Sequence, residues 1–396
     1  MSALSSQVES YLERSSWIRK MFEEGARLKQ EHGAEAVCDF SLGNPDLPPP
    51  PEVREALCQV AETMGNPFAA GYMPNPGYPE LRKRLAEEIT REQGKNLSAE
   101  HVVVTCGAAG GLNCMLKAVL EPGDEVITPA PFFVEYGFYC ENHGGALKPV
   151  PAHQPDFGLD LEAIEGAITE KTRAVIINSP HNPTGAVYGF GEQSALADLL
   201  RTKSAEFGRP IYLIADEPYR FLVYDGETVP PVLPMYEHAV VISSFSKNLS
   251  LAGARVGYVA VNPSMPDKDK LLAGLTLANR ILGFVNAPAL GQQVLLKVLG
   301  ASVDISVFEA RRKAMAEVLT EAGYEFTMPK GAFYFFPKAP GGDDVAFCAR
   351  LQEELVLAVP GSGFGCPGYF RLAFCVGEDV IRRAAPGFAK ARQAFA

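Results

Sequence analysis

The hydrophobic residues of the chain gather in short continuous runs, separated by stretches in which apolar residues recur with helical spacing. Continuous apolar runs of about 4–8 residues are typical of strands that are buried on both faces of a sheet. Amphipathic stretches lie between them, at residues 52–63, 80–90 and 107–120 for example. The pattern therefore predicts a mostly parallel sheet with helices on both faces. The predicted strands are residues 102–105, 126–128, 146–150, 174–178, 211–216, 240–242 and 257–261.

The pattern changes after residue 261, where longer helical stretches dominate. Predicted here are helices at 270–281, 288–299, 302–321 and 345–355, and strands at 331–336 and 370–374. The length of 396 residues is also too great for one typical hydrophobic core. We therefore expect a large α/β domain at residues 49–283. Residues 1–48 and 284–396 are expected to form an N-terminal arm, with a helix at 17–31, and a smaller α+β domain.

Composition and charge exclude several classes of function. The formal net charge is −11 and no long basic run is present, which argues against nucleic acid or an anionic membrane as the main partner. Eight scattered cysteines contain no C-x-x-C pair, so we expect reduced thiols and no metal site. The sequence has no apolar run of membrane-spanning length, and its first residues lack the apolar core of a signal peptide. These features favour a cytoplasmic protein.

Residues with useful chemistry follow several of the predicted strands. Gly107, Asn182, Asp216 and Lys247 all do so, and ligands of parallel sheets bind at the carboxyl ends of strands. A lysine that leaves a buried strand among serines is suited to act as an amine nucleophile, although a solvated surface lysine is the plain alternative. The glycine-rich turn from Gly107 precedes a helix and favours an anion, and Arg255 adds a fixed positive charge. This combination indicates pyridoxal phosphate.

Three motifs resemble those of the fold-type I pyridoxal-phosphate enzymes, specifically the class I/II aminotransferases, and occur in the family order. They are N-S-P-H-N-P-T-G at 178–185, D-E-P-Y at 216–219 and S-F-S-K-N-L-S-L-A-G-A-R-V-G at 244–257. The resemblance covers nearly the whole chain, and a chance match to all three motifs is negligible. It implies a large domain with a mostly parallel seven-stranded sheet covered by helices, plus a smaller α+β domain.

The resemblance implies roles around the cofactor ring. Lys247 would bind pyridoxal phosphate covalently and then act as general base and acid. Asp216 would pair with the pyridine nitrogen and keep it protonated, a helix-cap carboxylate being its plain alternative. Asn182 and Tyr219 would hydrogen-bond the ring hydroxyl, and Tyr219 is counted among the catalytic residues. Phe133 would stack on the ring, unless it is an ordinary core residue.

The resemblance also implies how the cofactor phosphate is held. The turn from Gly107 would offer the backbone N–H groups of Ala108 and Ala109, where many relatives carry a hydroxyl residue. Only main-chain donors remain in that turn, so the other ligands gain importance. Those are Ser244, Ser246 and Arg255, together with Tyr72, which in this family reaches the phosphate of the neighbouring subunit.

The substrate would be held by its α-carboxylate. Arg371 matches the arginine that grips this group with two parallel hydrogen bonds, with Asn182 beside it and Gly43 adding a backbone N–H. An edge-strand arginine and a simple glycine turn are the plain alternatives. The implied protein is a homodimeric aminotransferase that passes an amino group from an L-amino acid to a 2-oxo acid in a ping-pong cycle.

The sequence leaves the side-chain specificity open. Aspartate with 2-oxoglutarate is the first expectation, by family frequency, and alanine or aromatic donors are alternatives. A C–S β-lyase or a cyclopropane-forming synthase on the same fold would share Lys247, Asp216 and Arg371. A pyridoxal-phosphate-binding transcriptional regulator is disfavoured, because the 39 residues before residue 40 are too few and not basic enough for a DNA-binding domain.

Overall fold

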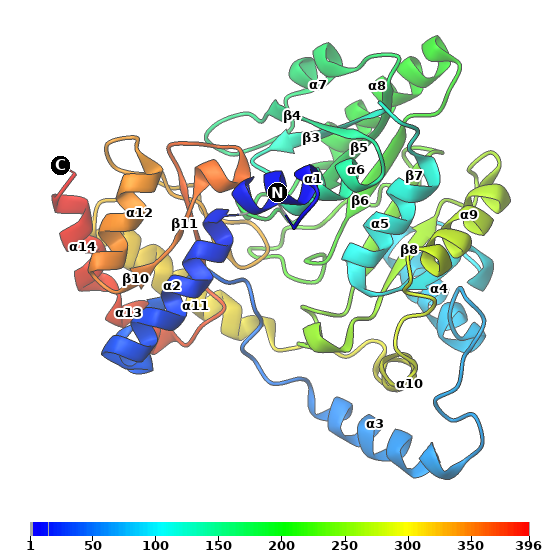
Figure 1. Ribbon diagram of the computed structural model, residues 1–396, viewed down its shortest axis with the longest axis horizontal. Coiled ribbons are helices and arrows are strands. Elements are labelled where there is room, and N and C mark those ends of the chain that lie inside the picture. The colour runs from blue at the N-terminus through cyan, green and yellow to red at the C-terminus, as the bar shows by residue number, and fades with distance from the viewer. Residues whose placement is uncertain (1–2, 15, 396) are drawn as a thin grey trace.

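The computed structural model describes residues 3–14 and 16–395 and contains the expected sheet (Figure 1). Seven strands hydrogen-bond in the order β2-β8-β7-β6-β5-β3-β4. Strand β8 runs antiparallel to both of its neighbours, and the other pairs are parallel. The mostly parallel seven-stranded sheet is thus confirmed. The strands are β2 (Val102–Thr105), β3 (Glu125–Ala130), β4 (Ala146–Pro151), β5 (Thr172–Asn178), β6 (Tyr212–Asp216), β7 (Ala239–Ser244) and β8 (Gly257–Val261).

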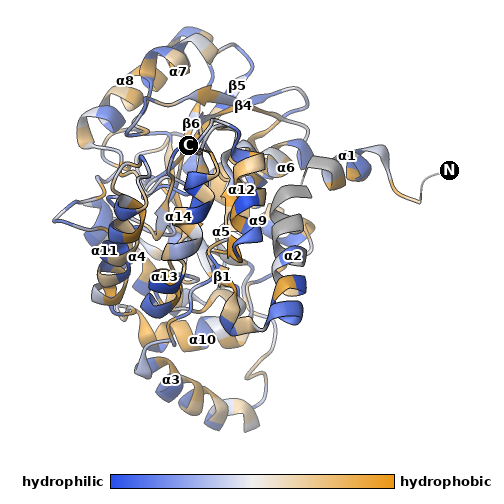
Figure 2. Cartoon of the chain, turned by 90° about the vertical axis from the view of Figure 1, so that its left-hand side faces the viewer, coloured by the Kyte–Doolittle hydropathy of each residue, from blue (hydrophilic) through white to orange (hydrophobic). Residues whose placement is uncertain are grey.

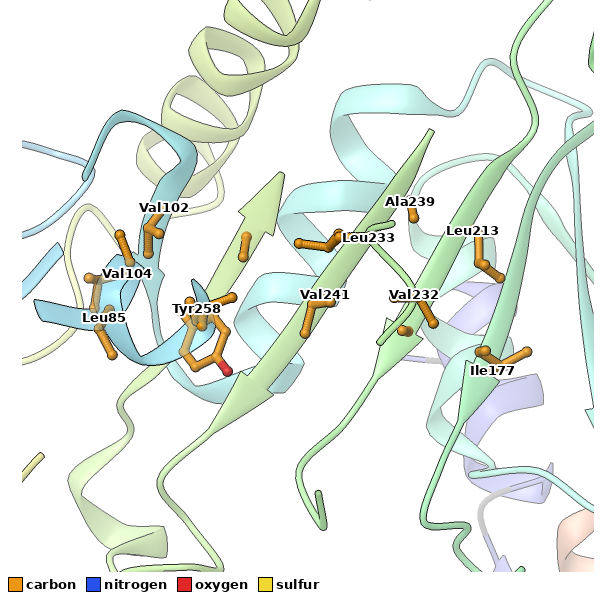
Figure 3. Close-up of a cluster of buried hydrophobic side chains, with 14 of the residues drawn as sticks. Leu85, Val102, Val104, Ile177, Leu213, Val232, Leu233, Ala239, Val241 and Tyr258 are labelled. Atoms are coloured by element: carbon orange, nitrogen blue, oxygen red, sulfur yellow. The ribbon is translucent and has the colours of Figure 1, made fainter. Parts of the chain in front are cut away.

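Helices cover both faces of this sheet because successive residues of a strand point to opposite sides. Val102 and Val104 belong to one hydrophobic cluster, shown in Figure 3, whereas Val103 between them belongs to the cluster on the other face. Helices α3, α4, α7, α8 and α10 contribute to the first cluster, and α5, α6 and α9 to the second. Their bounds are α3 (Pro51–Glu62), α4 (Pro79–Gln93), α5 (Gly107–Val119), α6 (Glu135–Asn142), α7 (Leu161–Ala167), α8 (Phe190–Phe207), α9 (Lys268–Ile281) and α10 (Ala289–Val298).

Helix α3 illustrates why these segments pack as they do. Hydrophilic and hydrophobic residues alternate around it in Figure 2, as expected for a helix with one buried face. Its buried residues are Val53, Ala56 and Val60, which have the i, i+3, i+7 spacing of one helix face. A proline occupies the first turn of the helix, where its missing N–H costs no hydrogen bond.

A smaller α+β unit lies at one end of the molecule, where Figure 1 groups α11 to α14 with α2. It contains a three-stranded sheet of order β11-β12-β9 and the parallel pair β1–β10, so both ends of the chain contribute to it. Its core is rich in aromatic rings, among them Phe333, Phe335 and Phe374. The elements are α1 (Ser6–Arg14), α2 (Ser16–His32), α11 (Ile305–Glu321), α12 (Asp344–Glu353), α13 (Glu378–Arg383), α14 (Ala385–Gln393), β1 (Cys38–Asp39), β9 (Tyr334–Phe335), β10 (Val356–Leu357), β11 (Val359–Pro360) and β12 (Phe370–Ala373).

Two details qualify the expectations. The strand expected at 331–336 covers Tyr334–Phe335 alone, because Ala332 adopts a left-handed conformation with φ of 56° that interrupts a strand. The limits of the two domains stay a prediction; helix α10, beyond residue 283, packs on α3 and α4 of the large sheet unit. Within the described residues, none of the helices is long and apolar enough to cross a membrane.

Candidate active site

The carboxyl ends of four strands lie at one edge of the large sheet. Strands β5, β6 and β7 are parallel neighbours, and β2 also runs parallel to β7 because each pairs antiparallel with β8. Gly107, Asn182, Asp216 and Lys247 follow or end these strands, as the sequence predicts. The topology therefore brings the residues expected to carry the chemistry to a common edge.

Asp216 is the last residue of β6, and its carboxylate is buried. The Tyr136 hydroxyl donates a hydrogen bond of 2.6 Å to Asp216 Oδ2, whereas Oδ1 has no partner among the residues that the structure describes. Burial raises the pKa of Asp216 to about 6, and the bond from Tyr136 opposes this rise. At neutral pH the residue is thus a buried carboxylate with one oxygen able to accept a further hydrogen bond. Tyr136 was not predicted as a site residue.

Lys247 follows β7 and points its amine at the segment after β1. Its Nζ donates a hydrogen bond of 2.6 Å to the carbonyl oxygen of Gly43. Loss of hydration lowers the pKa of Lys247 to about 8, and the positive charges of Arg371 and Arg255 act in the same direction, while Cys375 opposes them. A substantial fraction of the amine is therefore neutral near physiological pH, as a nucleophile or general base requires.

Arg371, in β12, is buried with part of its hydrogen-bonding capacity unused. Its Nη1 donates to Asn182 Oδ1 at 3.0 Å, its Nη2 donates to the Ser41 carbonyl oxygen at 2.7 Å, and its Nε has no partner. The guanidinium carbon lies 4.9 Å from the ring centre of Tyr334 and 4.7 Å from that of Phe364. Contact with two aromatic rings restrains the orientation of a guanidinium, which suits recognition of a planar carboxylate.

Residues 40–43 form a segment whose carbonyl oxygens are held one after another. Each accepts a hydrogen bond from a residue distant in sequence. The pairs are Ala373 N to Phe40 O (2.8 Å), Arg371 Nη2 to Ser41 O (2.7 Å), Cys375 Sγ to Leu42 O (3.4 Å) and Lys247 Nζ to Gly43 O (2.6 Å). Gly43, a predicted substrate residue, also packs so closely against Tyr334 that a side chain at this position would collide with its ring.

Gly107 and Arg255, two of the predicted phosphate ligands, meet at the start of α5. Gly107 has a φ of 70°, and a Cβ on it would lie 3.0 Å from Arg255 Nη2, so the absence of a side chain lets the guanidinium approach the first turn. Ala108 and Ala109 follow in that turn, where N–H groups lack intrahelical partners. Two further predicted ligands, Ser244 at the end of β7 and Ser246 just after it, are buried and lie within three residues of Lys247.

The other predicted residues differ in burial: Tyr219 and Phe133 lie inside the protein, whereas Tyr72 is on its surface. Tyr219 is buried, and its hydroxyl lies 2.7 Å from that of Tyr334, which the sequence did not single out. Phe133 is partly buried and meets the Tyr136 ring edge-on at 5.6 Å between centres. Tyr72, in contrast, is 95% exposed, and the described contacts do not bring it to the other site residues.

Comparison with known proteins identifies relatives of this chain. Residues 35–387 match the family model of aminotransferase class I and II. An aspartate/prephenate aminotransferase of Thermus thermophilus is 34% identical over 363 residues, covering 89% of this chain and 90% of the relative. An aspartate aminotransferase of Thermotoga maritima is 36% identical over 360 residues, covering 88% and 90%. The crystal structure of an amino transferase from Eubacterium rectale superposes with a TM-score of 0.95 at 40% identity, covering 100% of both chains.

Proposed function

Because the chain belongs to the class I and II aminotransferases, we propose that it uses pyridoxal phosphate to move the amino group of an L-amino acid to a 2-oxo acid in a ping-pong cycle. Aspartate and 2-oxoglutarate are the first substrate pair of this proposal, since the relatives from Thermus and Thermotoga carry aspartate in their names. The observation that supports it most directly is the unpaired Oδ1 of buried Asp216, at the same sheet edge as the amine of Lys247.

The residues at this edge fit pyridoxal phosphate. The unpaired Asp216 Oδ1 suits the protonated pyridine nitrogen, and the Arg255 guanidinium beside Gly107 suits the phosphate. When bound, the cofactor supplies a ring that accepts the electrons released when a substrate loses its α-proton. The proposed ring contacts are Phe133, Asn182 and Tyr219, and the proposed phosphate contacts are Gly107, Ala108, Ala109, Ser244, Ser246 and Arg255.

The protein's own groups would bind the substrate and move its proton. Arg371 donates one N–H to Asn182 and one to Ser41, and its Nε–H has no partner among the described residues, so a substrate α-carboxylate meets a guanidinium that is already oriented. The amine of Lys247, with its pKa lowered to about 8, is available to take up and return the α-proton. The Gly43 carbonyl oxygen, 2.6 Å from that amine in this structure, offers it an acceptor.

The proposed protein is a homodimer in which Tyr72 reaches the phosphate of the second copy. Tyr72 is 95% exposed and Phe68, four residues earlier, is 92% exposed with a strained φ of 62°. Exposed aromatic residues of this kind are typical of surfaces that another chain covers.

We also propose a reducing, cytoplasmic location for the protein. The eight cysteines are free, as is usual for proteins of that compartment.

The proposal is tested by adding pyridoxal phosphate to the purified protein and recording its visible absorbance. Borohydride reduction followed by peptide mapping is expected to find the pyridoxyl group on Lys247, and a modified lysine elsewhere would contradict the proposed site. A panel of amino donors with 2-oxoglutarate and pyruvate then identifies the substrates. Lys247→Ala is the control, and it should bind the cofactor without transamination because the proposed ring and phosphate contacts remain when the covalent bond and the proton-transferring amine are lost.

A further inference from the structure

Tyr334 lies outside the three motifs, yet its hydroxyl is the hydrogen-bond partner of Tyr219, a residue proposed to touch the cofactor. The two oxygens are 2.7 Å apart and both rings are buried. We propose that Tyr334 is a positioning residue, an inference that rests on the proposed function. Its hydroxyl would donate a hydrogen bond to the Tyr219 oxygen and so turn the Tyr219 hydroxyl toward the ring oxygen of pyridoxal phosphate.

The direction of the hydrogen bond follows from the number of protons available. A phenol has one proton to donate and can accept through its oxygen. If Tyr219 donates to the cofactor ring oxygen, the proton in the 2.7 Å contact must come from Tyr334. A hydroxyl that accepts one hydrogen bond becomes a stronger donor in the next, because a chain of hydrogen bonds polarises its members. Tyr334 would thus strengthen the bond from Tyr219 to the cofactor.

Tyr334 is held firmly enough to serve this purpose. It lies in β9, opposite Ala373 of β12. Arg371 lies in β12 two residues before Ala373, so the side chains of Arg371 and Tyr334 are on the same face of the small sheet. The Arg371 guanidinium covers one side of the ring at 4.9 Å, and Gly43 packs against the hydroxyl end. The Tyr334 ring therefore cannot swing away from Tyr219 without displacing the substrate-binding arginine or the segment that holds Lys247.

The smaller unit would in this way orient both proposed donors to the ring oxygen. Arg371 Nη1 donates to Asn182 Oδ1, which leaves the amide N–H groups of Asn182 free to face the cofactor. Tyr334 performs the equivalent task for Tyr219, with its own hydroxyl instead of a charge. Each of the two donors is thus fixed by a side chain from the small sheet.

The test is the pH titration of the visible spectrum of the bound cofactor in wild type, Tyr334→Phe, Tyr219→Phe and the double variant. Hydrogen bonds to the ring oxygen disperse its negative charge. When one of them is lost, the oxygen is more negative and attracts the proton on the neighbouring, lysine-linked nitrogen more strongly, so the pKa of that nitrogen, which the visible spectrum reports, rises. Tyr219→Phe should raise the spectroscopic pKa by about 1–2 units. Tyr334→Phe should raise it by roughly 0.1–0.6 units, since a neighbouring bond strengthens another by about 10–30%.

The double variant separates this role from a structural one. With the Tyr219 hydroxyl absent, Tyr334→Phe should have no further effect on the titration, so the double variant should match Tyr219→Phe. The proposal would be overturned if Tyr334→Phe titrated like wild type. It would also be overturned if Tyr334→Phe shifted the pKa of the double variant, relative to Tyr219→Phe alone, as much as it shifts the pKa of wild type. Tyr324→Phe is the matched control: its hydroxyl donates to the Phe388 carbonyl oxygen at 2.9 Å in the same hydrophobic cluster, and its titration should equal wild type. A wild-type protein that develops no visible absorbance with pyridoxal phosphate would contradict the proposed function instead.

Discussion

Replacing Asp216 with asparagine removes the negative charge that the proposed mechanism needs and leaves the shape of the side chain nearly unchanged. The carboxylate is buried, Tyr136 occupies one oxygen at 2.6 Å, and the other oxygen is unpaired. An opposite charge in such contact raises the pKa of a pyridine nitrogen by about 1–3 units. Without it, the protonated fraction of the ring falls by about 10–1,000-fold at pH values above the unassisted pKa, because each unit is a factor of ten.

Single-turnover absorbance measurements with an amino donor follow the step that depends on this protonation. The rate of the half-reaction in Asp216→Asn should fall by about 10–1,000-fold, for the reason just given. Retention of the cofactor should weaken less, since the proposed linkage to Lys247 and the proposed grip of Arg255 on the phosphate are untouched. Half-reaction rates within about threefold of wild type would refute the electrostatic role of Asp216.

Tyr136→Phe provides the matched control because it keeps the charge and removes a neighbouring hydrogen bond. The bond from Tyr136 lowers the pKa of Asp216, so its loss should move that pKa upward from about 6. The variant should therefore remain active above neutral pH and lose activity on acidification at a higher pH than wild type does. A loss that is equal at all pH values would show that Tyr136 acts by packing rather than through Asp216.

Three further predictions follow from the site. The protein without cofactor should capture pyridoxal phosphate through the neutral amine of Lys247, so stopped-flow rates should rise about tenfold per pH unit below pH 8 and level off above it, whereas a midpoint near 10.5 would contradict the lowered pKa. Arg371→Lys keeps the charge but loses the planar fork, so kcat/KM should fall about 30-fold or more for every amino donor, and a loss confined to acidic donors would place Arg371 in the side-chain pocket instead. Tyr72→Phe should weaken cofactor retention about tenfold. A hybrid dimer of one Lys247→Ala chain and one Tyr72→Ala chain should recover cofactor affinity at the one site where Lys247 and Tyr72 are both intact. If such hybrids form and no site recovers, Tyr72 serves its own chain.

The sheet was predictable because buried parallel strands leave a simple trace in the sequence. The run at 174–178 became β5 (Thr172–Asn178), and the run at 211–216 became β6 (Tyr212–Asp216), since such strands are covered on both faces and tolerate few polar residues. The short β9 shows the limit of that trace. Its aromatic run reads as one strand, but the left-handed Ala332 depends on tertiary packing that hydrophobicity does not encode.

The site residues also divide into those that a local sequence pattern predicts and those that depend on tertiary packing. The places of Asp216 and Lys247 were predictable because Asp216 ends β6 and Lys247 follows β7, and the rule that ligands bind at strand ends is a property of topology. Tyr136 and Tyr334 were not, because their partners Asp216 and Tyr219 lie 80 and 115 residues away in sequence. A signal for Tyr136 was its place three residues after the predicted Phe133, whose carbonyl oxygen accepts a hydrogen bond of 3.0 Å from the Tyr136 backbone N–H.

The hydrogen bonds of residues 40–43 explain why catalysis would require both parts of the molecule. The donors to Phe40, Ser41 and Leu42 lie on or just after β12 of the smaller unit, whereas the donor to Gly43 is Lys247, which follows β7 of the large sheet. The segment is therefore anchored at one end to the strand that carries Arg371, the proposed substrate-binding arginine, and at the other to the amine of Lys247. A movement of the smaller unit relative to the sheet must lengthen bonds at one of these ends. Arg371 is consequently linked to the acceptor of the lysine amine by one hydrogen bond, to the Ser41 carbonyl oxygen, and by the short stretch of backbone from Ser41 to Gly43.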